Sequence, residues 1–159
     1  ISNDDVVIEI GSGNGQALLE IEKKKPSKIY AVEISEDFRK VLFSRFNSAK
    51  ITITGNDAAN LASTVPDKSI DKAILINVIY FLDPLDTYLE ELKRILKTSG
   101  VIIIAGKFGL AQDFDPKIFK NTDIQKIMPA LEKHFAVTST YVDLGDESSR
   151  YHAIKLTRK

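Results

Sequence analysis

Cysteine and tryptophan are both absent from this 159-residue sequence. Without cysteine the chain can form no disulfide bond, thiolate metal site or cysteine nucleophile, and we expect an intracellular, cytoplasmic protein. A charge excess is missing too, because 22 lysine and arginine residues balance 22 aspartate and glutamate residues. No overall field therefore draws the chain to nucleic acid or to an anionic membrane, which argues against a basic nucleic-acid binder without excluding a local basic patch.

Long apolar runs are also missing. No stretch approaches the length of a membrane-spanning helix, so we expect no membrane span. Residues 2–5 are polar, and the start of the chain does not resemble a signal peptide. Because the chain begins without methionine, we expect a segment to precede Ile1. Hydrophobic residues make up 43% of the chain, which at this length predicts one domain, residues 1–159, with its own core.

Short apolar runs alternate with segments of helical period over the first two thirds of the chain. The predicted strands are 6–10, 28–33, 51–54, 70–77 and 101–105. The predicted helices begin at 16, after a cap at Ser35, and at 83–84. Alternation of this kind predicts right-handed crossovers and a parallel sheet. The second helix carries an apolar stripe of Phe38, Val41, Leu42 and Phe46, the third ends in a turn at 98–100, and residues 73–76 of the fourth strand are apolar on both faces.

The last third of the chain follows a different pattern. Residues 108–122 show no clear period, and helical spacing resumes from Ile124 to Leu131. Pro129 lies inside that helical run and predicts a kink or two short helices. The β-rich runs 135–144 and 151–157, joined by a polar turn at 145–149, predict an antiparallel hairpin.

A glycine-rich corner follows the first strand, with glycines at 11, 13 and 15. In the dinucleotide fingerprint Gly-x-Gly-x-x-Gly the third glycine would fall at position 16, which is glutamine. Glu9 lies two residues before the corner, where a carboxylate would repel a pyrophosphate but suits a ligand with an ammonium or sulfonium cation. The glycine spacing and Glu9 therefore disfavour a nicotinamide-dependent oxidoreductase.

Two further acids lie at predicted strand ends. Glu33 falls 22 positions after Gly11, where a carboxylate holds a ribose diol. Asp57 follows the third strand and can accept from the exocyclic amine of a base, although an Asx turn is the simpler role for it. Together with Glu9 these acids describe a site for a nucleoside that carries a positive charge.

Five stretches then carry a family resemblance: 6–15 (VVIEIGSGNG), 32–33 (VE), 55–58 (GNDA), 69–77 (SIDKAILIN) and 92–100 (LKRILKTSG). In this order they resemble the class I S-adenosylmethionine-dependent methyltransferases, over residues 5–106 and on through the closing hairpin. The resemblance implies an α/β fold, a three-layer Rossmann-like sandwich with a seven-stranded, mostly parallel sheet in the order 3-2-1-4-5-7-6 and strand 7 antiparallel. The helices that this family carries before the first strand are missing from this chain, and Ser99-Gly100 replaces the usual glycine pair.

The resemblance also implies a cofactor site for S-adenosyl-L-methionine, which becomes S-adenosyl-L-homocysteine. Glu9 would orient the amino group, and Glu33 would bind the ribose hydroxyls. Asp57 with the backbone of Ala58 would edge the adenine, and Asn77 would lie beside the transferring methyl. The other residues implied in this set are Gly11, Ser12, Gly13, Gly15 and Ile34.

Methyl transfer by in-line displacement is the implied reaction, with the enzyme holding nucleophile, methyl and sulfur in line. The neutral net charge favours a small-molecule acceptor, while nucleic acid and protein acceptors stay open and the sequence sets no oligomeric state. A non-catalytic cofactor-binding module of the same fold is the alternative. The candidates for a base are Asn77, Tyr80, Lys107 and Asp113.

The acceptor-side residues are weakly specified. Asn77 and Tyr80 match the ends of an Asn-Pro-Pro-Tyr motif, but both prolines are missing, which disfavours acceptors with planar amide or adenine nitrogens. Tyr80 and Phe81 are expected in a pocket wall or in packing. The segment 107–122 holds apolar residues that could line a pocket or simply pack, namely Phe108, Leu110, Phe114 and Phe119. His134 and His152 are expected to be structural or exposed.

Overall fold

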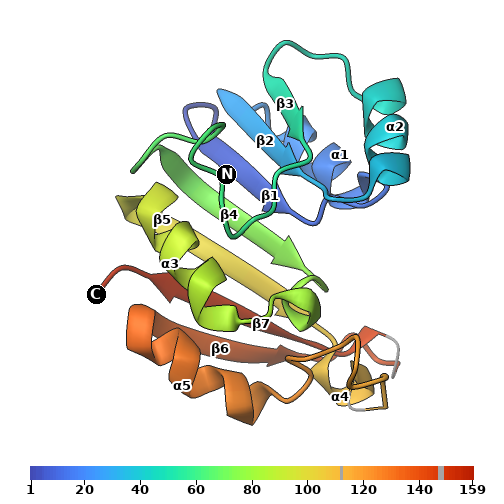
Figure 1. The fold of residues 1–159 in the computed structure, drawn as a ribbon, viewed down its shortest axis with the longest axis vertical. Helices are drawn as coiled ribbons and strands as arrows, with labels where there is room; N and C mark the ends of the chain where they lie inside the picture. Colours follow the sequence, from blue (N-terminus) through green and yellow to red (C-terminus); the bar gives the residue numbers. More distant parts are fainter. Residues whose placement is uncertain (112, 147–148) are drawn as a thin grey trace.

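The computed structural model describes residues 1–111, 113–146 and 149–159. Seven strands form one sheet in the order β3-β2-β1-β4-β5-β7-β6 (Figure 1). The strands are β1 (Val6–Ile10), β2 (Lys28–Val32), β3 (Ile51–Thr54), β4 (Ile70–Ile76), β5 (Leu96–Gly106), β6 (Ala136–Val142) and β7 (Tyr151–Thr157). β7 is antiparallel to both of its neighbours and the other pairs are parallel, which confirms the expected fold.

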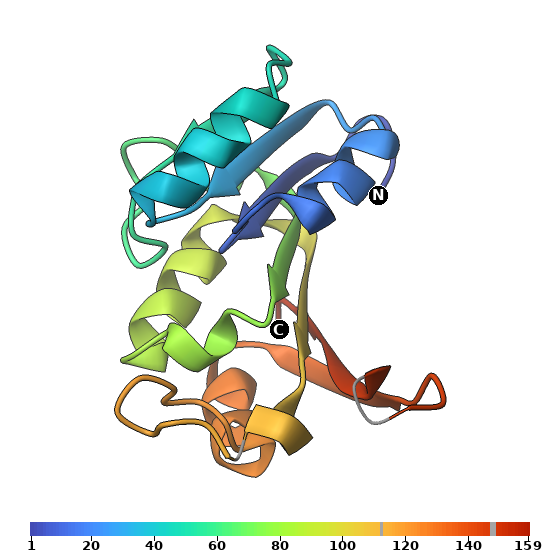
Figure 2. The same ribbon diagram turned by 90° about the vertical axis from the view of Figure 1, so that its right-hand side faces the viewer.

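Helices flank the sheet on two faces, and Figure 2 shows α1 on the opposite side from α3 and α5. The helices are α1 (Gln16–Lys23), α2 (Glu36–Arg45), α3 (Leu85–Ile95), α4 (Phe108–Ala111), α5 (Ile124–His134) and the short 3-10 helix η1 (Ile79–Phe81). The pleat of β1 explains the layers, because successive side chains point to opposite faces. Val7 packs in a core with Leu18 and Leu42, whereas Ile8 packs in the core that contains Leu89 and Leu131.

β5 is longer than the sequence predicts. Helix α3 ends at Ile95, and Leu96 already pairs with Ile70 of β4, so the predicted turn at 98–100 is wrong. The strand pairing shifts register between Ile70 and Lys72, which accommodates the additional residues. Leu96 is fully buried, and hydrophobic burial of this side chain favours an immediate start of the strand over another helical turn.

α5 runs unbroken through Pro129, so the expectation of two short helices is wrong. Proline at this position removes the hydrogen bond to the carbonyl of Gln125, four residues earlier. Both Gln125 and Pro129 are exposed, and water can satisfy that carbonyl.

The predicted turn at 145–149 includes residues 147 and 148, which lie outside the described residues. Within the described residues no helix precedes β1, and none is long and apolar enough to cross a membrane. His134 is buried and contacts Asp86 at 2.6 Å, which ties α5 to α3 and confirms a structural place for this histidine.

Candidate cofactor site

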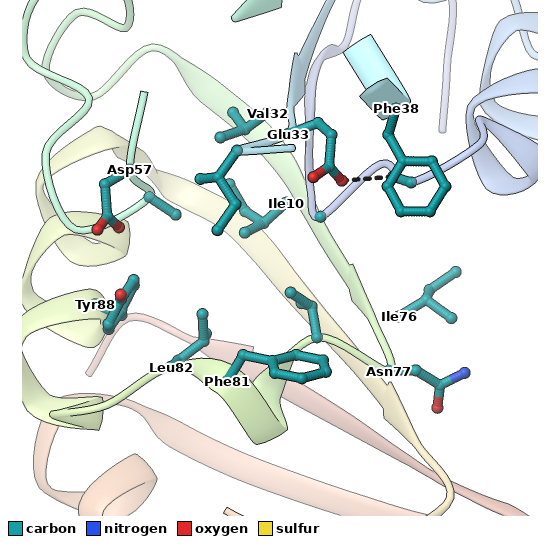
Figure 3. A pocket seen from close by; sticks show the side chains of 15 residues that line it. Ile10, Val32, Glu33, Phe38, Asp57, Ile76, Asn77, Phe81, Leu82 and Tyr88 are labelled. Atoms are coloured by element: carbon teal, nitrogen blue, oxygen red, sulfur yellow. Dashed lines mark hydrogen bonds between the residues drawn. The ribbon is translucent and has the colours of Figure 1, made fainter. Parts of the chain in front are cut away.

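A cavity of about 380 Å³ opens at the carboxyl ends of β1, β2 and β4. The strand order reverses between β1 and β4, which is where ligands bind in open α/β sheets. Seven of the predicted cofactor residues line it: Gly11, Gly13, Glu33, Ile34, Asp57, Ala58 and Asn77. Glu9, Ser12 and Gly15 do not line it. Figure 3 shows Glu33 and Asp57 on one side of the cavity, with Phe81 and Leu82 across from them.

The three glycines of the corner share the left-handed backbone region, with φ of +73° at Gly11, +51° at Gly13 and +82° at Gly15. Only glycine adopts such angles without strain. A Cβ at Gly13 would meet nothing within 4 Å, so this position presents bare backbone to open space. A Cβ at Gly15 would lie 2.6 Å from the ring of Phe46, which gives Gly15 a role in packing α1 against α2.

Glu33 joins the glycine corner to the end of β2. One of its carboxylate oxygens accepts from the backbone N–H of Gly13 at 2.8 Å, drawn as the dashed line in Figure 3. The other accepts from the N–H of Ser35, also at 2.8 Å. Each carboxylate oxygen can accept more than one hydrogen bond, so the group keeps acceptor capacity toward the cavity that it lines.

Glu9 is 3% exposed, and its Oε2 has no hydrogen-bond partner among the described residues. Burial raises the pKa of this carboxyl to about 7; a hydrogen bond with Ser12 lowers it and the charge of Glu33 raises it further. A buried carboxylate oxygen without a partner is costly. A cationic group of a ligand would remove that cost.

Asp57 forms a local turn and also lies at the cavity. Its Oδ1 accepts from the backbone N–H of Ala59 at 2.9 Å, which is the Asx turn. The side chain also lines the cavity and lies near the hydroxyl of Tyr88 (Figure 3). Burial raises the pKa of Tyr88, and the charge of Asp57 and a hydrogen bond with it raise it further.

Sequence reasoning missed several apolar residues of the cavity. Phe38 and Val41 were expected to pack with Leu42 and Phe46, but they are 47% and 38% exposed, and Phe38 lines the cavity mouth. Tyr88 is a half-buried residue of α3 and shows no sequence signal for a ligand site. Phe81 lines the cavity, in agreement with the expected pocket wall.

The sequence of residues 8–104 matches the protein family described as Methyltransferase domain. The chain belongs to this family. Its cofactor is S-adenosylmethionine, and the residues present fit that molecule: an unpartnered buried carboxylate at Glu9, bare backbone at Gly13 and two acids at the cavity. This methyltransferase domain therefore carries a site whose chemistry matches a positively charged nucleoside.

Three known proteins illustrate the relationship. The small-subunit ribosomal RNA methyltransferase A of Persephonella marina is 31% identical over 104 residues, which cover 52% of this chain and 36% of that protein. A complex of the Haloferax volcanii Trm112 methyltransferase activator with a methyltransferase matches with TM-score 0.82 at 14% identity, covering 100% of this chain and 85% of that one. An Archaeoglobus fulgidus SAM-dependent methyltransferase matches with TM-score 0.79 at 20% identity, covering 98% and 86%. The structural matches show the fold.

Proposed function

We propose that this domain transfers the methyl group of S-adenosylmethionine to a small, largely apolar acceptor. One observation carries the proposal: a second cavity, of about 320 Å³, lies beside the first, and Asn77 lines both. Four of its six lining residues are apolar or aromatic, and the chain has no net charge that would attract a polyanion. Donor and acceptor would then meet beside Asn77.

The cofactor residues have distinct roles in this proposal. Glu33 binds the ribose hydroxyls, and Asp57 with the backbone of Ala58 edges the adenine. Glu9, buried behind the glycine corner and outside the cavity lining, orients the amino group through water. Gly11 and Gly13 let the ligand approach the backbone, and Ser12 and Ile34 belong to the same set.

When bound, the cofactor supplies an already activated methyl group. The protein's task is to hold the acceptor in line with it and to exclude water. Among the candidates for a base, Asp113 is exposed and lines neither cavity, so it is set aside. Tyr80 is a poor candidate, because burial raises the pKa of its hydroxyl and so keeps it protonated, an effect that the backbone N–H of Lys107 partly opposes. Asn77 and Lys107 remain at the second cavity.

A ribosomal RNA acceptor is the second candidate, favoured by the similarity to the Persephonella marina enzyme. The burial of Tyr80 argues against an RNA acceptor that is bound through the Asn-x-x-Tyr pattern of Asn77 and Tyr80. Its side chain is 3% exposed and its ring packs against Phe108, Phe114 and Phe119, so the ring is not free to stack on an extruded base.

Titration calorimetry with S-adenosylmethionine and S-adenosylhomocysteine tests the cofactor site first. We expect both to bind and NAD to bind far more weakly; tighter binding of NAD would contradict the proposal. Formation of S-adenosylhomocysteine is then followed with a panel of small aromatic acceptors and with small-subunit ribosomal RNA. Turnover with RNA alone would favour the second candidate, and cofactor binding without turnover on any acceptor would favour a non-catalytic module.

A further inference from the structure

The second cavity lies at the carboxyl ends of β4 and β5, next to the cofactor cavity. Its lining residues are Asn77, Tyr80, Lys107, Leu110, Phe114 and Phe119. Asn77 follows β4 directly, and Lys107 follows β5 directly. The cavity therefore spans the gap between the loops that leave two neighbouring strands.

Hydrogen bonds connect the two loops that form this cavity. The backbone N–H of Lys120 donates to the carbonyl of Tyr80 at 2.7 Å. The amide of Asn121 donates to the carbonyls of Ile79 at 2.9 Å and Leu82 at 2.7 Å. Because the segment after α4 is fastened to η1 at three carbonyls, the cavity needs little ordering when a ligand enters.

Aromatic rings form much of its wall. Phe114 and Phe119 lie 4.8 Å apart, and each lies 6.4 Å from the ring of Tyr80. Phe108 contacts Tyr80 edge-on from behind, at 5.5 Å. Walls of this kind favour a flat, apolar ligand, since aromatic groups stack and pack edge-to-face on one another.

Lys107 is the cation at this cavity. It is half-buried, and its ammonium makes no ion pair or side-chain hydrogen bond with any residue that the structure describes. Lys107 is distinguished from the other lysines without an ion pair by its place in the cavity lining. An unpaired ammonium beside apolar walls attracts an anion more strongly than it would in water, because the local dielectric constant is lower.

We propose that the second cavity binds an aromatic acceptor through an ionised oxygen, such as a phenolate, with Lys107 as the cation that holds it. This inference rests on the proposed function and names its acceptor class. The ionised oxygen would form a bond to the methyl carbon while the carbon–sulfur bond breaks with its electron pair on sulfur. The hydroxyl proton leaves to solvent beforehand, so no protein base is required.

The test uses 4-nitrophenol, which changes its absorption on ionisation, and nitrobenzene as the same ring without the hydroxyl. Each is titrated into the cofactor-free protein by calorimetry, which gives the two affinities. The absorption band of 4-nitrophenol reports, in the same samples, how much of it is ionised. We expect the protein to bind the phenolate about tenfold more tightly than nitrobenzene, and to lower the apparent pKa of the bound phenol. Lys107→Met should remove about tenfold of that preference, while Lys117→Met, an exposed lysine on the same segment, should not.

Three results would overturn the inference: equal binding of the two probes, a preference that survives Lys107→Met, or tight binding of small-subunit ribosomal RNA with no phenolate binding. Thermal unfolding checks that both variants fold. The same samples are titrated with S-adenosylhomocysteine. If the protein binds the cofactor but shows no preference for the phenolate, the proposed acceptor class is wrong, while the proposed methyl transfer is not contradicted. Phenolate preference without cofactor binding removes the proposed function and, with it, the role of this cavity as an acceptor site.

Discussion

Strands of the one sheet differ in how many of their faces are covered. On β1, the neighbours Val7 and Ile8 point to opposite faces and neither is exposed. On β5, Ile102 and Ile104 are also fully buried, but Ile103 between them is only half-buried. On β4, Leu75 is 1% exposed and Ile76 is 42% exposed. The half-exposed side chains share one face, because Ile74 pairs with Ile103 and Ile76 with Ala105.

The difference separates the half of the sheet around β1 and β2 from the half around β4 and β5. Helices α1 and α2 complete the sandwich over β1 and β2, whereas α3 and α5 cover the other face (Figure 2). The sequence predicts that residues 73–76 of β4 are apolar on both faces. Their side chains are apolar on both faces, but only one of these faces is fully buried. Glu9 lies on the boundary, since it pairs with Ala31 of β2 and with Ile74 of β4.

The largest expected effect comes from two neighbouring substitutions in β5. Ile104→Ala should lower the free energy of unfolding by about 2–5 kcal/mol, because a fully buried isoleucine leaves a cavity. Ile103→Ala, on the half-exposed face, should cost about 1 kcal/mol, because less apolar area returns to water. Urea unfolding measures both. Similar losses of unfolding free energy in the two variants would show that the two faces of β5 are equally covered, which would contradict the difference in exposure between them.

Glu9 gives a pH dependence at the boundary. Its folded pKa of about 7 lies above the ordinary value of 4.5, so the folded state binds more protons between these values. Stability should therefore fall by about 3 kcal/mol as the pH rises from about 4.5 to 7. Urea unfolding across this range should show the fall, and Glu9→Gln should remove it. The exposed Glu90→Gln is the matched control, and a slope that persists in Glu9→Gln would assign the effect to another group.

Substitution of Glu33 tests the proposed cofactor site. Glu33→Ala should weaken S-adenosylhomocysteine binding by about 1.5–3 kcal/mol, because a charge-assisted contact to the ribose is lost together with the tie to Gly13. Glu36→Ala, an exposed acid at the start of α2, is the control. Calorimetric titration compares them. An unchanged affinity in Glu33→Ala would place the ribose elsewhere.

The smallest effect compares a glycine from each half. A Cβ would meet nothing within 4 Å at either Gly13 or Gly109. Gly13→Ala should nevertheless destabilise by about 1–2 kcal/mol, because φ is positive there. Gly109→Ala, in the short helix α4, should be neutral or stabilise by up to about 1 kcal/mol. Thermal unfolding of the two variants measures the difference, and equal shifts would mean that the left-handed backbone at Gly13 carries no strain.

Much of the fold could be predicted because its signals are local. The closing hairpin follows from two β-rich runs joined by a polar turn, and Ser35 caps α2 by accepting from the N–H of Phe38. The strand order, by contrast, was implied by the family resemblance. Seven of the ten predicted cofactor residues line one cavity, and Glu9 lies buried behind it. The start of β5 at Leu96 and the unbroken α5 were missed, since strand pairing with Ile70 and exposure of Pro129 depend on distant residues or on solvent.

The sequence by itself determined the glycine corner, the acids at the strand ends and the family. These follow from backbone chemistry and from spacing along successive strand-turn-helix units. Only the tertiary structure decided that Asn77 and Lys107, 30 positions apart, share a cavity, and that one face of β4 and β5 stays half-exposed. The physical reason is range: φ preferences and the pleat act between neighbouring residues, whereas burial and cavity shape are properties of segments that meet only after folding.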